Sequence, residues 1–168
     1  IGSAGTQNLP NSQLDRFLMK LSMGYPDVDS QVRILRERSQ QEPLEQVEPV
    51  MRREELIAAI ARVRQVHVDD QIYDYIARLA EVTRTHPLLK LGISPRGALA
   101  LCRTAKARAF AEGRDFVVPE DVPQMAEYVF AHRLMLSSKA RLNEYTPEAI
   151  VAEVLAQTQP PVLSERRA

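Results

Sequence analysis

Most of the chain after residue 50 places apolar residues at the 3.6-residue spacing of an α-helix. In the segment 53–65, Leu56, Ile60 and Val63 fall on one face of the predicted helix. The helices predicted in this way cover 28–40, 53–65, 69–86 and 94–113, and two more begin at 119–121 and 146–148. The segment 41–51 contains prolines and predicts an extended connector. The fold class is therefore mainly α from about Val28 onward.

The pattern is different near the start of the chain. Residues 1–13 predict a loop, with a short helix that begins near Pro10. Residues 17–23 then carry apolar side chains at every second position, which predicts a β-strand, and Gly24 ends it. No second convincing strand is found, since 116–117 is too short to build a sheet. Because an isolated strand leaves its backbone groups unpaired, we expect this one to belong to a larger α/β domain.

Residues 92–99 (GISPRGAL) hold the most informative local pattern. Ser94 is a favoured N-cap, and Pro95 then occupies the first helical position, where its missing N–H costs nothing. Arg96 places a positive charge against the positive end of the helix dipole. An anion such as a phosphate would satisfy both the dipole and the guanidinium. The alternative is that Arg96 pairs with a nearby acidic residue on the surface.

Composition narrows the possible functions. The 168 residues carry 22 basic and 22 acidic side chains, which gives no electrostatic case for nucleic-acid binding. No apolar run is long enough to span a membrane, and no signal-peptide pattern is present. The single cysteine, Cys102, lies on an apolar helix face and predicts a reduced core residue. These features favour a cytoplasmic protein.

Motifs for chemistry within this sequence are lacking. There is no phosphate-binding loop of the form GxxxxGK[ST], and the histidines at 67, 86 and 132 have no partners at metal-ligand spacing. The paired acids at 69–70 and 120–121 lie at helix starts, where capping explains them. We therefore expect this chain to bind no metal and to catalyse no reaction by itself.

Five short motifs together resemble a MoxR-type AAA+ ATPase. They are residues 9–17 (LPNSQLDRF), 24–26 (GYP), 92–96 (GISPR), 113–116 (GRDF) and 119–122 (PEDV). The resemblance runs from about Gly5 to Leu134 and implies the C-terminal part of such a protein. Residues 1–27 would be the remnant of the α/β core, and 28–51 a linker helix and connector. Residues 52–157 would form the helical lid, and 158–168 a flexible tail.

The resemblance also implies roles for individual residues. Arg16 falls where related proteins place the arginine finger that reaches the γ-phosphate of a neighbouring subunit. Arg96 falls at the sensor-2 arginine, which contacts the nucleotide of its own subunit, with Ser94 and Pro95 beside it. The full-length protein would use ATP and Mg²⁺, with neither bound by this chain alone. It would form a homo-oligomeric ring, expected to be a hexamer, and act on von Willebrand factor A-type protein partners.

The sequence departs from the family pattern at a few positions. Thr6 begins a TQN triplet similar to the sensor-1 strand end, but a gap-free alignment places it in the loop before the LP motif. Asn11 stands where an acid is usual, and Val118 replaces a threonine cap, at a cost of about 1 kcal/mol. Two alternatives remain open: a free-standing helical adaptor that binds proteins, and an AAA+ protein of the magnesium-chelatase type.

Overall fold

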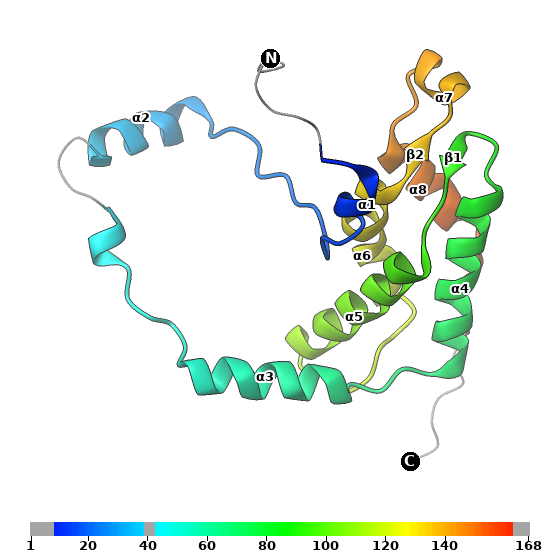
Figure 1. Cartoon of the computed structure of the whole chain (residues 1–168). Coiled ribbons are helices and arrows are strands. Elements are labelled where there is room, and N and C mark those ends of the chain that lie inside the picture. The colour runs from blue at the N-terminus through cyan, green and yellow to red at the C-terminus, as the bar shows by residue number, and fades with distance from the viewer. Residues whose placement is uncertain (1–8, 39–42, 163–168) are drawn as a thin grey trace. The chain divides into compact units, whose positions relative to one another are not determined.

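The computed structural model describes residues 9–38 and 43–162, and these are mainly helical (Figure 1). The described chain divides into two compact units, one formed by 9–20 with 62–162 and the other by 21–61. The elements are α1 (Asn11–Leu14), α2 (Val28–Arg38), η1 (Pro43–Gln46), α3 (Arg53–Gln65), α4 (Asp70–Thr85), β1 (Leu89–Leu91), α5 (Pro95–Ala111), α6 (Asp121–Phe130), η2 (Ala131–Arg133), β2 (Met135–Leu136), α7 (Ser138–Leu142) and α8 (Pro147–Gln157).

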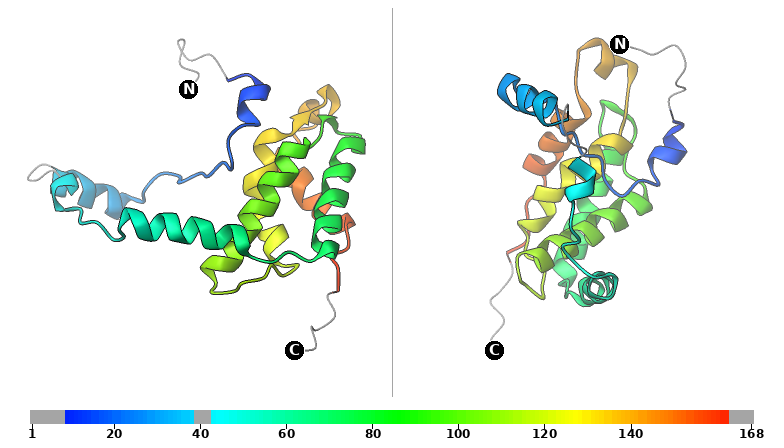
Figure 2. Two further views of the ribbon diagram at one scale, coloured as in Figure 1. Left: turned by 60° about the horizontal axis from the view of Figure 1, so that its bottom comes forward. Right: turned by 90° about the vertical axis from the view of Figure 1, so that its left-hand side faces the viewer.

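The first unit is a helical bundle built around one hydrophobic core. Helices α4, α5, α6 and α8 pack against one another in it (Figure 2). Each helix turns its apolar face inward, as its periodicity predicts. The largest fully buried side chains are Tyr75, Phe130, Ile72, Leu79, Ile93, Leu101 and Ile150. The predicted mainly α fold is confirmed in this unit.

Two short strands escaped the sequence analysis. Strand β1 pairs with β2 in an antiparallel arrangement, and Leu89 lies opposite Leu136. A single parallel bridge also joins His67 to Phe116. Segments of two or three residues are too short to display a period, so their pairing depends on the packing of the helices that flank them.

The strand predicted at 17–23 is wrong. This segment has no strand structure, and its amides do not join a sheet. The Lys20 N–H instead donates to the Tyr128 carbonyl at 2.9 Å, and Met19 packs partly against the core. The sequence at 17–23 does alternate between apolar and other residues, but alternation alone does not make a strand, because a strand also needs a partner for its backbone groups.

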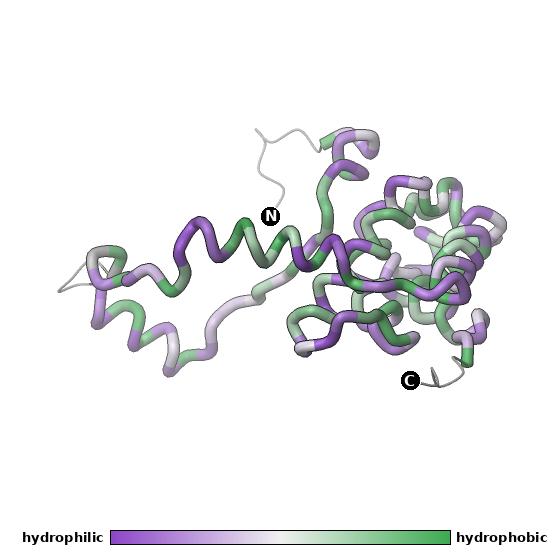
Figure 3. Tube along the Cα trace, turned by 90° about the horizontal axis from the view of Figure 1, so that it is seen from below, coloured by the Kyte–Doolittle hydropathy of each residue, from purple (hydrophilic) through white to green (hydrophobic). Residues whose placement is uncertain are grey.

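The second unit is built on α2 and η1 and on α3 as far as residue 61. The bounds predicted for α3 are confirmed. Helix α2 is present over Val28–Arg38, and the last two residues of its predicted range, 39 and 40, lie outside the described residues. No residue of either helix is buried, and the Leu56 and Ile57 side chains are each about half exposed. Figure 3 shows hydrophobic and hydrophilic residues alternating along these helices. The described residues of this unit therefore form no core of their own.

Hydrogen-bonding side chains fix where several helices begin. Asp69, Ser94 and Thr146 each accept a backbone N–H of the first turn, as the sequence analysis predicts for Ser94. Ser137 caps α7 in the same way, a short helix that the periodicity did not indicate. The flexible tail was expected to begin at residue 158, whereas Thr158 is buried and caps the end of α8. Among the described residues, no helix is long and apolar enough to cross a membrane.

Candidate functional site

The loop between α4 and α5 is held in place by Gly92 and Ile93. A β-carbon on Gly92 would lie 2.6 Å from backbone atoms of Thr83 and Arg84, so only glycine fits without moving the end of α4. The Ile93 side chain is buried, and its N–H donates to the Thr83 hydroxyl at 2.9 Å. This packing fixes the point at which α5 begins.

The first turn of α5 has the predicted cap. The Ser94 hydroxyl accepts the Gly97 N–H at 3.2 Å, and Pro95 occupies the first turn. Gly97 is buried there, and a β-carbon on it would lie 2.8 Å from Ile93 Cγ2 and 3.0 Å from Arg133 Cδ. The absence of a side chain at Gly97 leaves room for the stem of Arg133.

Arg96 projects from this turn with 59% of its side chain exposed. Its Nε lies 4.0 Å from Asp15 Oδ2, at the limit of an ion pair. An exposed pair at this distance contributes between about 0 and 1 kcal/mol. The surface-pair alternative therefore has a partner in the structure, but the pair is weak enough for an anion to replace it.

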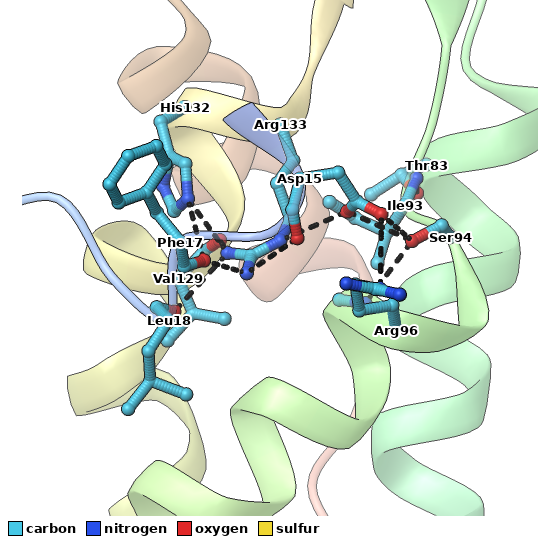
Figure 4. A network of polar contacts seen from close by, with 11 residues as sticks. Asp15, Phe17, Leu18, Thr83, Ile93, Ser94, Arg96, Val129, His132 and Arg133 are labelled. Carbon is cyan, nitrogen blue, oxygen red and sulfur yellow. Dashed lines mark hydrogen bonds and ion pairs between the residues drawn. The ribbon is translucent and has the colours of Figure 1, made fainter. Parts of the chain in front are cut away.

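Asp15 lies at the centre of a polar network that joins the residues after α1 to the start of α5 (Figure 4). Its carboxylate accepts from the Ser94 hydroxyl at 3.0 Å and from Arg133 Nε at 3.2 Å. Ser94 thus donates to Asp15 while it accepts from the helix backbone. The network also brings Arg96 to the same carboxylate.

Arg133 holds the chain that follows α1. Its side chain is 2% exposed, and it donates to the carbonyls of Asp15 (3.4 Å), Leu18 (3.3 Å) and Phe17. A further bond goes to the Val129 carbonyl within the same helical turn. Burial lowers the pKa of Arg133 while the Asp15 carboxylate raises it. We call Arg133 and its contacts with residues 15–18 the Arg133 clamp.

His132 lies beside the clamp as a neutral ring. His132 Nε2 lies 2.9 Å from Arg133 Nη1 and 3.4 Å from the Phe17 carbonyl. Because a guanidinium can only donate, Nε2 accepts in the shorter of the two contacts. Burial, followed by the positive charge of Arg133, lowers the pKa of His132. The Nδ1 atom is buried without a hydrogen-bond partner. A proton added to this ring would bring two positive charges together.

Arg16 lies one residue after Asp15 in an exposed turn. Its backbone N–H donates to the Gln13 carbonyl at 3.0 Å, which fixes the turn. The structure thus brings Ser94, Pro95 and Arg96 together at the start of α5. It places Arg16 next to the Asp15 end of the same network, with its side chain toward solvent.

The arrangement can bind an anion but offers no metal cage. The N-terminal turn of α5 and the guanidinium of Arg96 both favour negative charge. Among residues 9–38 and 43–162, no group of three or more histidine, cysteine or acidic side chains could hold a metal ion. Burial raises the pKa of the Cys102 thiol, which makes it a poor nucleophile. A pocket of about 310 Å³ lies at the other end of α5, beside Phe110, away from this site.

The sequence analysis missed Asp15 and Arg133 as site residues. Asp15 belongs to the QLDRF motif, but the sequence analysis assigned a role only to its neighbour Arg16. Arg133 follows an apolar stretch, 129–131, and an arginine in such a position signals a buried cation that needs partners. Its partners are mostly carbonyl oxygens, which no sequence motif reveals.

The comparisons with known proteins agree with the architecture. Residues 81–154 match the family model of the AAA lid domain. The chain is 40% identical over 158 residues to the uncharacterized protein YeaC of Bacillus subtilis (strain 168), covering 94% of this chain and 49% of that protein. It is 30% identical over 160 residues to chaperone MoxR1 of Mycobacterium tuberculosis, covering 90% of this chain and 42% of that protein.

A solved structure gives the same result. The crystal structure of a "putative ATPase" from Cytophaga hutchinsonii superimposes with a TM-score of 0.87 at 27% identity, over 96% of this chain and 52% of that one. The chain therefore spans about half the length of the proteins it matches.

Proposed function

Because this chain carries the lid domain of a MoxR-type AAA+ protein, we propose that the whole protein binds and hydrolyses ATP. The observation that carries the proposal is the start of α5, where an exposed arginine stands at a capped helix N-terminus inside a lid domain. In this chain the lid residues bind and orient phosphate. The phosphate-binding loop and the acids for Mg²⁺ are expected elsewhere in the whole protein.

Arg96 is proposed to contact the phosphates of the nucleotide bound by its own subunit. Ser94 and Pro95 support this role because they fix the helix turn that presents the guanidinium. The pairing with Asp15 is too weak to neutralise Arg96 fully. A phosphate at this place would gain a charge-assisted, bidentate contact that the carboxylate at 4.0 Å does not make.

Arg16 is proposed to be the arginine finger that acts on a neighbouring subunit. Its position in an exposed turn supports this role, because a finger must reach beyond its own chain. An arginine supplied from a neighbouring subunit stabilises the charge of the transferring phosphoryl group. Such an arginine raises the rate of nucleotide hydrolysis by about 10³–10⁵-fold. Hydrolysis then requires an assembled ring, for which we propose a hexamer.

The biological role proposed for the whole protein is that of a chaperone-like factor that remodels or matures protein complexes in the cytoplasm. The similarity to a relative named as a chaperone supports this role. Von Willebrand factor A-type proteins are the partner class that we propose. The neutral charge of this chain, with 22 basic and 22 acidic residues, supports a protein client over nucleic acid.

The first prediction separates the two arginines by the subunit that each serves. In the whole protein, Arg96→Ala should weaken nucleotide binding in the mutated subunit, because its contact lies in cis. Arg16→Ala should leave binding nearly intact and lower kcat by about 10³-fold or more, since its contact forms mainly in the transition state. Nucleotide titration and steady-state ATP hydrolysis measure both effects.

Subunit mixing provides the control. An Arg16→Ala subunit with an intact nucleotide site, mixed with a subunit that lacks a working site but keeps Arg16, should regain hydrolysis. The same mixture with Arg96→Ala should stay inactive, because that defect remains with its own nucleotide. Equal rescue of both variants, or an Arg16→Ala ring that hydrolyses ATP normally, would show that the assignment of the finger is wrong.

A further inference from the structure

We propose that Asp15 and Arg133 are positioning residues that fasten the Arg16 turn to the lid, so that Arg16 moves together with Arg96. The inference rests on the proposed function for its consequence in catalysis. The observation behind it is the Arg133 clamp, whose guanidinium comes from outside both arginine motifs. Asp15 and Arg133 touch no nucleotide in this proposal and act only through Arg16 and Arg96.

The clamp has the properties of a rigid fastener. Arg133 is almost completely buried, and its donors reach three main-chain carbonyls around Arg16, namely those of Asp15, Phe17 and Leu18. Several bonds that converge from one planar group fix both position and orientation. The turn that carries Arg16 is therefore held from both sides of that residue.

The clamp is linked to Arg96 through two side chains, Asp15 and Ser94. The Asp15 carboxylate that accepts from Arg133 Nε also accepts from the Ser94 hydroxyl, and Ser94 caps the helix that carries Arg96. Gly97 in the same turn packs against the stem of Arg133. The two arginines are thus carried by one packed assembly that includes the start of α5 and η2.

This arrangement has a mechanical consequence in a ring. When the lid shifts because Arg96 engages the nucleotide of its own subunit, the Arg16 turn shifts with it. The finger presented to the neighbouring subunit then depends on the nucleotide state of the subunit that supplies it. The clamp would be the physical link between the two sites.

The test in the whole protein uses Asp15→Asn, which keeps the size of the side chain and removes its charge. We expect kcat to fall by between about tenfold and 100-fold, as a shift of about 1 Å in a reacting group produces. The KM for ATP should not rise, because removing a carboxylate near Arg96 leaves that guanidinium more available. A general loss of lid structure would raise KM, so the split between kcat and KM identifies a positioning role.

The matched control is Asp74→Asn, which also removes a carboxylate paired with an arginine, Arg78, but on the exposed face of α4. It should change neither kcat nor KM. If Asp15→Asn behaves like this control while Arg16→Ala abolishes turnover, the inference is wrong and the proposed function stands. If Arg16→Ala is silent, the proposed function itself is wrong.

A second measurement uses the 168-residue chain and does not depend on catalysis. Arg133→Lys keeps the charge but cannot form the fork of bonds to residues 15–18. Hydrogen exchange of the Lys20 amide, which donates to Tyr128, should accelerate at least about tenfold in this variant, while α4 and α5 stay protected. Unchanged exchange at Lys20 would overturn the clamp, and circular dichroism verifies that the variant is folded.

Discussion

At the scale of single residues, two glycines explain why the start of α5 has its particular sequence. Gly92 lies against backbone, whereas Gly97 lies against the side chains of Ile93 and Arg133. Backbone cannot yield as a side chain can, so the two positions should respond differently to the same added methyl group. The contrast tests whether the motif serves packing as well as chemistry.

The corresponding prediction compares Gly92→Ala with Gly97→Ala in the 168-residue chain. Overpacking costs about 1–3 kcal/mol, and we expect Gly92→Ala at the upper end of this range and Gly97→Ala nearer the lower end. Urea unfolding measures both free energies. The reverse order, or no effect of Gly92→Ala, would contradict the close approach seen at the end of α4.

His132 gives a prediction about pH. Burial and the charge of Arg133 lower its pKa below the ordinary value of 6.5, so the unfolded chain binds a proton more readily than the folded chain. The stability from the neutral ring is therefore fully present above pH 6.5 and is lost as the pH falls toward the lower, folded-state value. Urea unfolding at a series of pH values measures this loss.

The control for this effect is His132→Gln, in which the glutamine carbonyl can accept from Arg133 but carries no titrating group. The loss of stability below pH 6.5 should be smaller in the variant than in the parent chain. Both chains keep His67 and His86, so the difference between them belongs to His132. Identical pH profiles would show that burial and Arg133 do not lower the pKa of His132 in the folded chain.

At the scale of elements, the start of α6 depends on one buried carboxylate. The side chain of Asp121 is 3% exposed and accepts two bonds from Arg114, at 2.7 and 2.8 Å, and the Val118 N–H at 2.9 Å. Its role is therefore more than the capping that the sequence analysis assigned to it. Glu120, beside it, makes no side-chain cap bond.

This difference predicts the outcome of two matched substitutions. Asp121→Asn leaves Arg114 without its charged partner and should lower the free energy of unfolding by about 3 kcal/mol. Glu120→Gln removes the same charge from an exposed position and should change it by less than about 0.5 kcal/mol. Thermal or urea unfolding distinguishes the two, and equal effects would contradict the structural account.

The helices and strands also show how much of the secondary structure could be predicted from the sequence. Long helices such as α3 and α4 were predicted closely because their periodicity extends over several turns. The strand at 17–23 was wrong because periodicity reports a half-buried surface, and Lys20 finds its backbone partner on α6 instead of in a sheet. Strands β1 and β2 were missed because they are too short to carry a period.

The candidate site could be predicted only where it depends on neighbouring residues in the sequence. The cap by Ser94 follows from a local rule and is confirmed. The contribution of Arg133 could not be predicted, because its partners come from residues more than a hundred positions away and are mainly backbone carbonyls. The roles of Arg16 and Arg96 toward nucleotide remain predictions.

At the scale of the whole molecule, the two compact units should differ in local stability. Helices α2 and α3 bury no residue, and at 11 and 13 residues they are short for helices that must persist without packing. Helices α4, α5 and α6 share a buried core. The unit formed by 21–61 should therefore open without unfolding the other.

Hydrogen exchange of the 168-residue chain tests this expectation. Amides of α2 and of residues 53–61 should exchange at least about 100-fold faster than those of α5, which should exchange only by global unfolding. The dependence on urea should also be weak for the fast amides, since their opening exposes little new surface. Equal protection in the two units would show that 21–61 is packed more firmly than its exposure indicates.

The Arg133 clamp determines which of its positions can accept substitutions. Because it binds the carbonyls of Phe17 and Leu18, it places no demand on their side chains, which are 53% and 49% exposed. Every amino acid offers the same carbonyl. The clamp therefore leaves positions 17 and 18 free to vary, whereas its carboxylate and guanidinium, at Asp15 and Arg133, must be inherited as a pair.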